Sequence, residues 1–166
     1  DWSSRVLFRS KDEELAKEME LFIEHGTCGV SIDAQTKADA VIRHELNKNK
    51  YPTDPEIETN LNTLLSRMNI VREKYAKPMI ITSGLRSKNK QLELMIKGLS
   101  KASKSHHLTG AACDVLDDSG DLGKWCLSHQ KLLEEIELWC EHPSATRGWV
   151  HFQIFPPNSG KRFFFP

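Results

Sequence analysis

The stretch Ser105-His-His-Leu-Thr-Gly-Ala-Ala-Cys-Asp114 brings two histidines, a glycine and an apolar run ending in a carboxylate close together in the sequence. Zinc in catalytic sites takes imidazole nitrogens and carboxylate oxygens from three side chains and keeps one position for water. A tight turn at Gly110, followed by small residues, lets the backbone pass close to a metal. Asp114 lies in an apolar, strand-like run, where an unpaired carboxylate is costly to bury. The stretch therefore predicts a metal site that includes Asp114 and one of the histidines.

A third ligand must come from elsewhere in the chain. The segment Trp149-Val-His-Phe-Gln-Ile-Phe155 is typical of a strand, and Pro156 ends it. Trp149, His151 and Gln153 share one face of that strand, because side chains alternate along it. A single histidine in a strand is more often structural than metal-binding. The prediction of His151 as the third ligand therefore depends on the combined spacing.

The pattern further out predicts an α+β fold. Thr53 or Asp54 can cap a helix that Pro55 begins, and apolar residues then recur at three- and four-residue steps to about residue 75. Helices grouped before and between a few strands, without a βαβ rhythm, favour this class. The other expected helices span about 13–25, 36–46, 88–97, 122–128 and 132–140, and the expected strands span about 78–82, 111–116 and 149–155.

Length and composition indicate one domain over residues 1–166, with about 1–12 as a tail. Lys plus Arg equals Asp plus Glu at 23 each, which argues against nucleic acid as a partner. No apolar run approaches the roughly 20 residues that cross a bilayer, and the first residues carry no signal-peptide core, so we expect no membrane partner. We expect a monomer. The four cysteines are expected as buried free thiols, with two disulfides as the alternative: Cys28, Cys113, Cys126 and Cys140.

The spacing Ser105-x-His-x-x-Gly-x-Ala-x-Asp114, followed by Trp149-Val-His151, closely resembles the signature of the M15 zinc peptidases. These are D-alanyl-D-alanine carboxypeptidases and dipeptidases, with related peptidoglycan endopeptidases of bacteria and phages. The run Ile80-Ile-Thr-Ser-Gly-Leu-Arg-Ser87 resembles a second landmark of the family, with Leu85 in place of tyrosine. The resemblance covers about residues 55–155. It implies a small antiparallel central sheet flanked by helices, as in the DD-peptidases and the hedgehog zinc domain.

The resemblance also implies roles for individual residues. Its register makes His107, Asp114 and His151 the ligands of one Zn²⁺ ion. The metal would polarise a peptide carbonyl and lower the pKa of its bound water. Arg86 would bind a substrate carboxylate or the developing oxyanion, and Ser105 would contact the substrate or order its loop. The implied function is a zinc-dependent peptidase, either carboxypeptidase or endopeptidase, that cleaves peptidoglycan stem peptides or cross-links.

The sequence departs from the family pattern at one position. Many members place an acidic general base three residues before the last histidine ligand, where this chain has Gly148. Glu141 and His142 are the candidates for a replacement, and we predict His142, because imidazole titrates near neutral pH. The alternative is a non-catalytic, zinc-stabilised module of a phage particle or cell-wall assembly. As a phage lysis protein, the chain could reach the cell wall from the host cytoplasm without a signal of its own.

Overall fold

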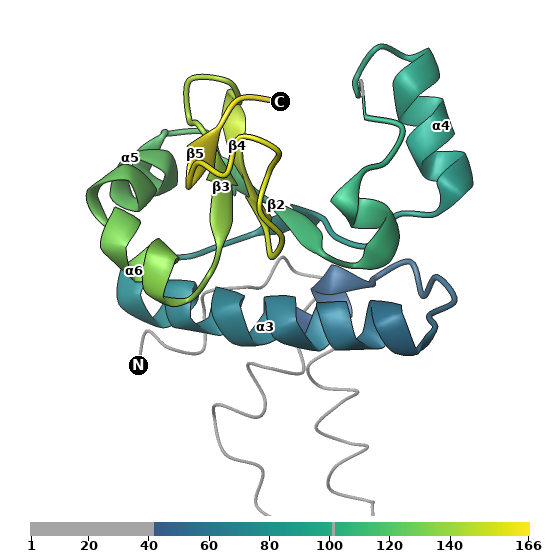
Figure 1. Ribbon diagram of the computed structural model, residues 1–166, viewed down its shortest axis with the longest axis horizontal. Coiled ribbons are helices and arrows are strands. Elements are labelled where there is room, and N and C mark those ends of the chain that lie inside the picture. Colours follow the sequence, from purple (N-terminus) through teal and green to yellow (C-terminus); the bar gives the residue numbers. More distant parts are fainter. Residues whose placement is uncertain (1–41, 101) are drawn as a thin grey trace, which may run out of the picture.

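The computed structural model describes residues 42–100 and 102–166, and its longest helix is α3, Pro55–Tyr75 (Figure 1). The Asp54 side chain caps the helix by accepting a hydrogen bond from the backbone N–H of Ile57. Ala76 ends it in a left-handed conformation. One face of α3 is buried, as its apolar spacing predicts, through Asn60, Leu61, Leu64, Met68 and Val71. The predicted helix 55–75 is confirmed.

Five strands form one sheet in the order β1-β2-β4-β3-β5. Pairing is antiparallel except between β3 and β5, which run parallel. The α+β prediction is confirmed, with one parallel edge added to the expected antiparallel sheet. The strands are β1 Ile81–Ser83, β2 Ala112–Asp117, β3 Trp139–Glu141, β4 Gly148–Gln153 and β5 Phe163–Phe164.

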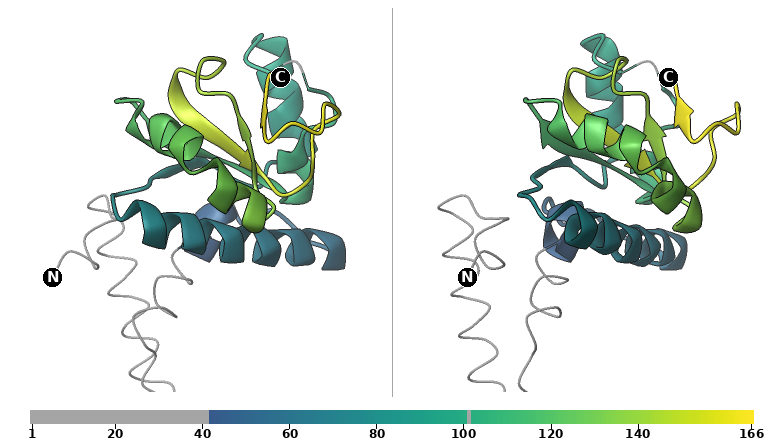
Figure 2. Two further views of the ribbon diagram at one scale, coloured as in Figure 1. Left: turned by 60° about the vertical axis from the view of Figure 1, so that its left-hand side comes forward. Right: turned by 90° about the vertical axis from the view of Figure 1, so that its left-hand side faces the viewer.

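The two faces of the sheet differ in character. One face packs against α3, which lies beneath the strands in both views of Figure 2. Each leucine- or phenylalanine-sized side chain buried there contributes about 1.5–3 kcal/mol. The opposite face carries Asp114, because side chains alternate along β2. The residues of β2, β3 and β4 that belong to the hydrophobic core are fully buried: Cys113, Val115, Cys140, Val150 and Phe152.

The shorter elements surround this sheet. Residues 42–46 are helical, and α4 (Lys88–Ile96) lies on the opposite side of the sheet from α5 (Asp121–Ser128) and α6 (Gln130–Glu135) in Figure 1. A 3₁₀ helix, η1 (His106–Thr109), leads into β2. None of the described helices is long and apolar enough to cross a membrane.

The structure differs from the sequence prediction after residue 135. The expected helix 132–140 is wrong at its C-terminal end, because Glu137 adopts a left-handed φ of 52° and the chain turns into β3. Pairing with β4 on one side and β5 on the other outweighs the helical spacing of the leucines. β5 is an element that the sequence analysis missed.

Other local predictions have mixed outcomes. The strand expected at 78–82 begins only at Ile81, although Ile80 still accepts a backbone hydrogen bond from Leu116. Three of the cysteines are free and buried, as expected: Cys113, Cys126 and Cys140. Cys28, the predicted helix 13–25 and residues 36–41 of the predicted helix 36–46 lie outside the described residues.

Gly84 sits where the chain leaves β1, and it allows two backbone segments to touch. A Cβ atom at this position would lie 2.3 Å from the carbonyl oxygen of Leu46. The next residue, Leu85, donates its N–H to that same oxygen at 2.7 Å. The close approach therefore joins the helical segment 42–46 to the turn that leads to Arg86.

We expect Gly84→Ala to lower the free energy of unfolding by about 3 kcal/mol, because a backbone carbonyl cannot move aside as a side chain can. Gly160→Ala is the control: nothing lies within 4 Å of its added Cβ, and only its φ of 65° opposes the change, a cost of about 1 kcal/mol. Urea unfolding measures both. Equal stability of the two variants would contradict the close-approach explanation.

Candidate metal centre

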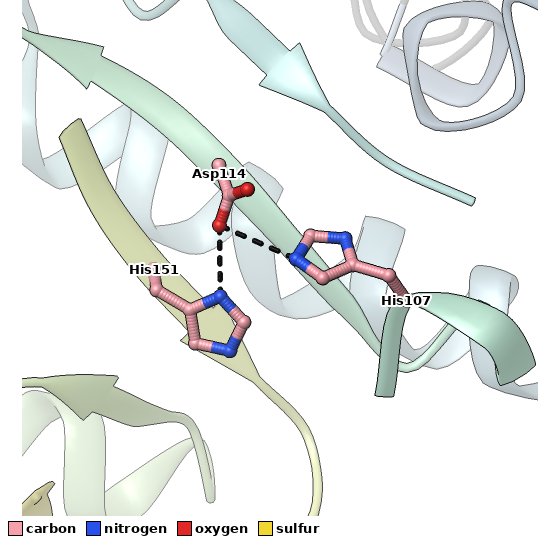
Figure 3. A group of neighbouring side chains, drawn as sticks. All are labelled: His107, Asp114 and His151. Carbon is pink, nitrogen blue, oxygen red and sulfur yellow. Dashed lines mark hydrogen bonds and ion pairs between the residues drawn. The ribbon is translucent and has the colours of Figure 1, made fainter. Parts of the chain in front are cut away.

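Three side chains from three different elements converge above the sheet (Figure 3). His107 comes from η1, Asp114 from β2 and His151 from β4. Each offers one ligand atom, and these atoms all lie within 4.8 Å of one another. Oδ1 of Asp114 is 2.8 Å from Nδ1 of His151 and 3.3 Å from Nε2 of His107. The three residues singled out by their spacing are thus brought together in space.

The local backbone explains why they meet. Asp114 and His151 are direct partners in the β2–β4 register, so their side chains leave the sheet on the same face. His107 reaches them because Gly110 turns the chain at a φ of 69°. A Cβ on Gly110 would lie 2.8 Å from the side chain of Leu61. Glycine at 110 therefore allows η1 to pack on α3 and still lead directly into β2.

The cluster is largely shielded from solvent. His107 is 2% exposed, and burial lowers its pKa against the opposing charge of Asp114. Burial alone would raise the pKa of Asp114, but the charges and hydrogen bonds of the two histidines hold it well below its usual range. For His151, burial lowers the pKa, yet the hydrogen bond and charge of Asp114 outweigh it and raise the pKa overall. A carboxylate is thus kept ionised between two imidazoles.

The orientation of His107 fits a cation. Its Nδ1 lies 2.8 Å from the carbonyl oxygen of Gly84. A carbonyl can only accept, so Nδ1 carries the proton and donates it. Nε2 of the neutral ring then presents a lone pair to Oδ1 of Asp114. Two acceptors facing each other repel unless a positive ion lies between them, so the donor set fits a metal such as zinc.

Arg86 binds the second carboxylate oxygen of Asp114. Its Nη2 donates to Oδ2 at 2.7 Å, while its Nε donates to Ser83 Oγ at 2.8 Å. Its Nη1 is 3.4 Å from Oε1 of Gln91. Burial lowers the pKa of Arg86 and the charge of Asp114 opposes this, but a guanidinium stays protonated at neutral pH. Arg86 therefore orients Asp114 and leaves Oδ1 to face the histidines.

Gln91 is a residue of the site that the sequence analysis missed. It lies on α4, is 2% exposed and supports Arg86. Its amide nitrogen donates to Ser100 Oγ at 2.8 Å and to the carbonyl oxygen of Ala102 at 2.7 Å. A glutamine in a short helix rich in lysine gives no sequence signal of burial.

Ser105 lies at the start of η1. Its hydroxyl accepts a hydrogen bond from the backbone N–H of His107 at 3.4 Å, which caps the short helix. We expected Ser105 either to contact the substrate or to order its loop, and this contact is of the second kind. His106, the neighbour that the family register set aside, packs its ring near Phe155.

The two candidates for a proton acceptor lie in different surroundings. Continuing the β3–β4 register by one residue places Glu141 opposite His151, on the face that carries Asp114. Burial raises the pKa of Glu141, while the charges of His151 and Asp114 act on it in opposite directions. Glu141 therefore belongs to the surroundings of the cluster.

The structure does not bring His142 to the cluster. It follows the last residue of β3, and its backbone N–H donates to the carbonyl oxygen of Phe164 on β5 at 2.7 Å. Its Nδ1 pairs with Ser144 Oγ at 2.8 Å, and its ring stacks on Phe165. The choice of His142 from its titration range ignored the strand alternation that places Glu141 at the site.

A family model described as Peptidase M15 matches residues 18–132, more than half of the sequence, and the match includes His107 and Asp114. Among solved structures, the chain is similar to the L-Ala D-Glu endopeptidase ChiX of Serratia marcescens. The two are 22% identical with a TM-score of 0.48, over 70% of this chain and 99% of that one. A search of curated proteins found no match. The family match confirms the resemblance of the motifs: this chain belongs to the Peptidase M15 family.

Proposed function

We propose that this chain is a zinc-dependent peptidase that cleaves peptidoglycan stem peptides or their cross-links. The observation that carries the proposal is the cluster of two imidazoles and one carboxylate with all ligand atoms within 4.8 Å. Membership of a peptidase family supports the reaction type. The substrate class follows from the resemblance of the motifs to peptidoglycan-cleaving members. Carboxypeptidase and endopeptidase activities both remain within the proposal.

His107, Asp114 and His151 would hold the zinc ion. Bound there, zinc would supply a Lewis acid for the carbonyl of the scissile peptide and would lower the pKa of a bound water. Arg86 would keep Asp114 ionised and fixed in orientation. Its Nη1, which Gln91 holds only at 3.4 Å, is the nitrogen that would turn toward a substrate carboxylate. Ser105 would order the start of η1, which carries His107, through the hydrogen bond that caps this helix.

Glu141 would take the place of the acid missing at position 148. Gly148 has a φ of 86°, a conformation that an acidic residue would adopt only with strain. Glu141 presents a carboxylate to the same face from the neighbouring strand. There it would accept a proton from the attacking water and deliver it to the leaving amine. This placement favours the enzyme over the non-catalytic module, because the missing acid was the main argument for that alternative.

Alanine substitution tests the ligand set. His107→Ala and His151→Ala should each lose stoichiometric zinc, because two remaining protein ligands hold the ion too weakly to survive gel filtration. His129→Ala is the matched control, since His129 is exposed and stacks on Trp125. Zinc content per chain after gel filtration is the measurement. A full equivalent of zinc in either ligand variant would show that the ligand set is wrong.

Peptidase activity tests the assignment of Glu141. Purified protein incubated with muropeptides should release D-alanine or cut cross-bridges, and a chelator should stop the reaction. Glu141→Gln should lower kcat by about 10²- to 10⁴-fold, as expected for loss of a general base, while it retains zinc. His142→Ala should stay within a few-fold of the wild type. If neither D-alanine release nor cutting of cross-bridges is seen as a chelator-sensitive reaction, the chain is not the proposed enzyme.

Burial of Glu141 should also appear in the stability of the metal-free protein. Because burial raises the folded-state pKa of this carboxyl above its ordinary 4.5, the folded state loses stability as pH rises above that value. Glu141→Gln carries no such charge. In the presence of a chelator, its Tm should therefore exceed that of the wild type at pH 7 and match it near pH 4. A lower Tm at pH 7 would contradict the described burial.

A further inference from the structure

Gln153 is a buried amide beside the cluster to which the proposed reaction gives no role. It is 4% exposed and ends β4, two residues after His151 and on the same face of the strand. It faces Ala112 on β2 and Trp139 on β3, so strands cover it on both sides. A polar side chain buried to this degree is costly unless its hydrogen bonds are made.

The orientation of the Gln153 amide is fixed by one neighbour. Its nitrogen donates to the carbonyl oxygen of Phe155 at 2.7 Å. Since that carbonyl can only accept, the amide cannot be flipped without losing the bond. The amide oxygen is consequently the atom that lies 3.3 Å from Nε2 of His151.

An amide oxygen accepts and never donates, so Nε2 of His151 must carry a proton to bond with it. A neutral imidazole has one N–H, and its other nitrogen then presents a lone pair. That nitrogen is Nδ1, which points at Oδ1 of Asp114 from 2.8 Å. Two hydrogen bonds therefore follow one another: Nε2–H of His151 donates to the amide oxygen of Gln153, and the amide nitrogen of Gln153 donates to the carbonyl oxygen of Phe155.

We propose that Gln153 is a positioning residue that makes Nδ1 of His151 the metal-binding nitrogen. The inference rests on the proposed zinc site. In His107 the two nitrogens have the reverse roles: Nδ1 donates its proton to the carbonyl oxygen of Gly84, and Nε2 is left free for the metal. Without the Gln153 oxygen, the neutral ring of His151 would also adopt the tautomer with its proton on Nδ1. That proton would bond to Asp114 and compete with the ion. Partners that orient ligands in this way typically change metal affinity by about 10- to 100-fold.

The first test uses the unaltered protein loaded with zinc and labelled with ¹⁵N on histidine. Long-range ¹H–¹⁵N spectra identify which nitrogen of each ring is protonated. We expect the proton of His151 on Nε2 and that of His107 on Nδ1. A protonated Nδ1 in zinc-loaded His151 would overturn the inference and leave the proposed enzyme standing.

The second test is Gln153→Met, which keeps the length of the side chain and removes the acceptor. Zinc affinity measured by competition with a chelator should fall about 10- to 100-fold, and the Nε2–H signal of His151 should exchange with water faster than in the wild type. A merely structural role would leave that exchange unchanged. Gln130→Met, at an exposed position of α6, is the control and should change neither quantity.

The outcomes separate the two claims. Unchanged affinity and unchanged exchange in Gln153→Met would overturn the role of Gln153 alone. Failure of the wild type to bind zinc at all would overturn the proposed function, and this inference with it. If Gln153→Met does not fold, the spectra of the wild type decide the question.

Discussion

Asp114 lies directly opposite His151 in the antiparallel pair β2–β4, and its Oδ1 is 2.8 Å from Nδ1 of that histidine. A carboxylate so little exposed is stable only if both of its oxygens are compensated. Arg86 compensates Oδ2, and the two histidines share Oδ1. The pairing of these two strands therefore fixes the point at which Arg86 and His107 meet the carboxylate.

The two faces of the sheet have different roles: one forms the core, and the other carries the candidate site. The buried face packs on α3 and forms the core, while the same strands present a row of polar groups on the other face. Because adjacent strands are hydrogen-bonded to each other, these polar side chains cannot move apart unless the strands separate. The three side chains of the cluster are thus held close together by the fold itself, which would lower the cost of binding an ion.

Much of this arrangement follows from the sequence. The helix at 55–75 and the strands carrying Asp114 and His151 have strong periodic patterns, and the motif spacing identified the three clustered residues. His142 was preferred to Glu141 for the titration range of imidazole. The strand β3, which sets the direction of Glu141, was not predicted, because it forms through pairing with strands that are distant in sequence. Gln91 and Gln153 act through amide orientation, which depends on neighbours that no local pattern reveals.

The central claim is that the buried cluster is a metal centre with a carboxylate beside it. A crystal structure of the zinc-loaded protein, with anomalous differences recorded at the zinc edge, tests this most directly. The account predicts one peak about 2.0–2.2 Å from Nε2 of His107, Oδ1 of Asp114 and Nδ1 of His151. It also predicts that the Glu141 carboxylate lies within hydrogen-bond reach of the fourth ligand. No peak among these three atoms, or a peak held by other residues, would contradict the account.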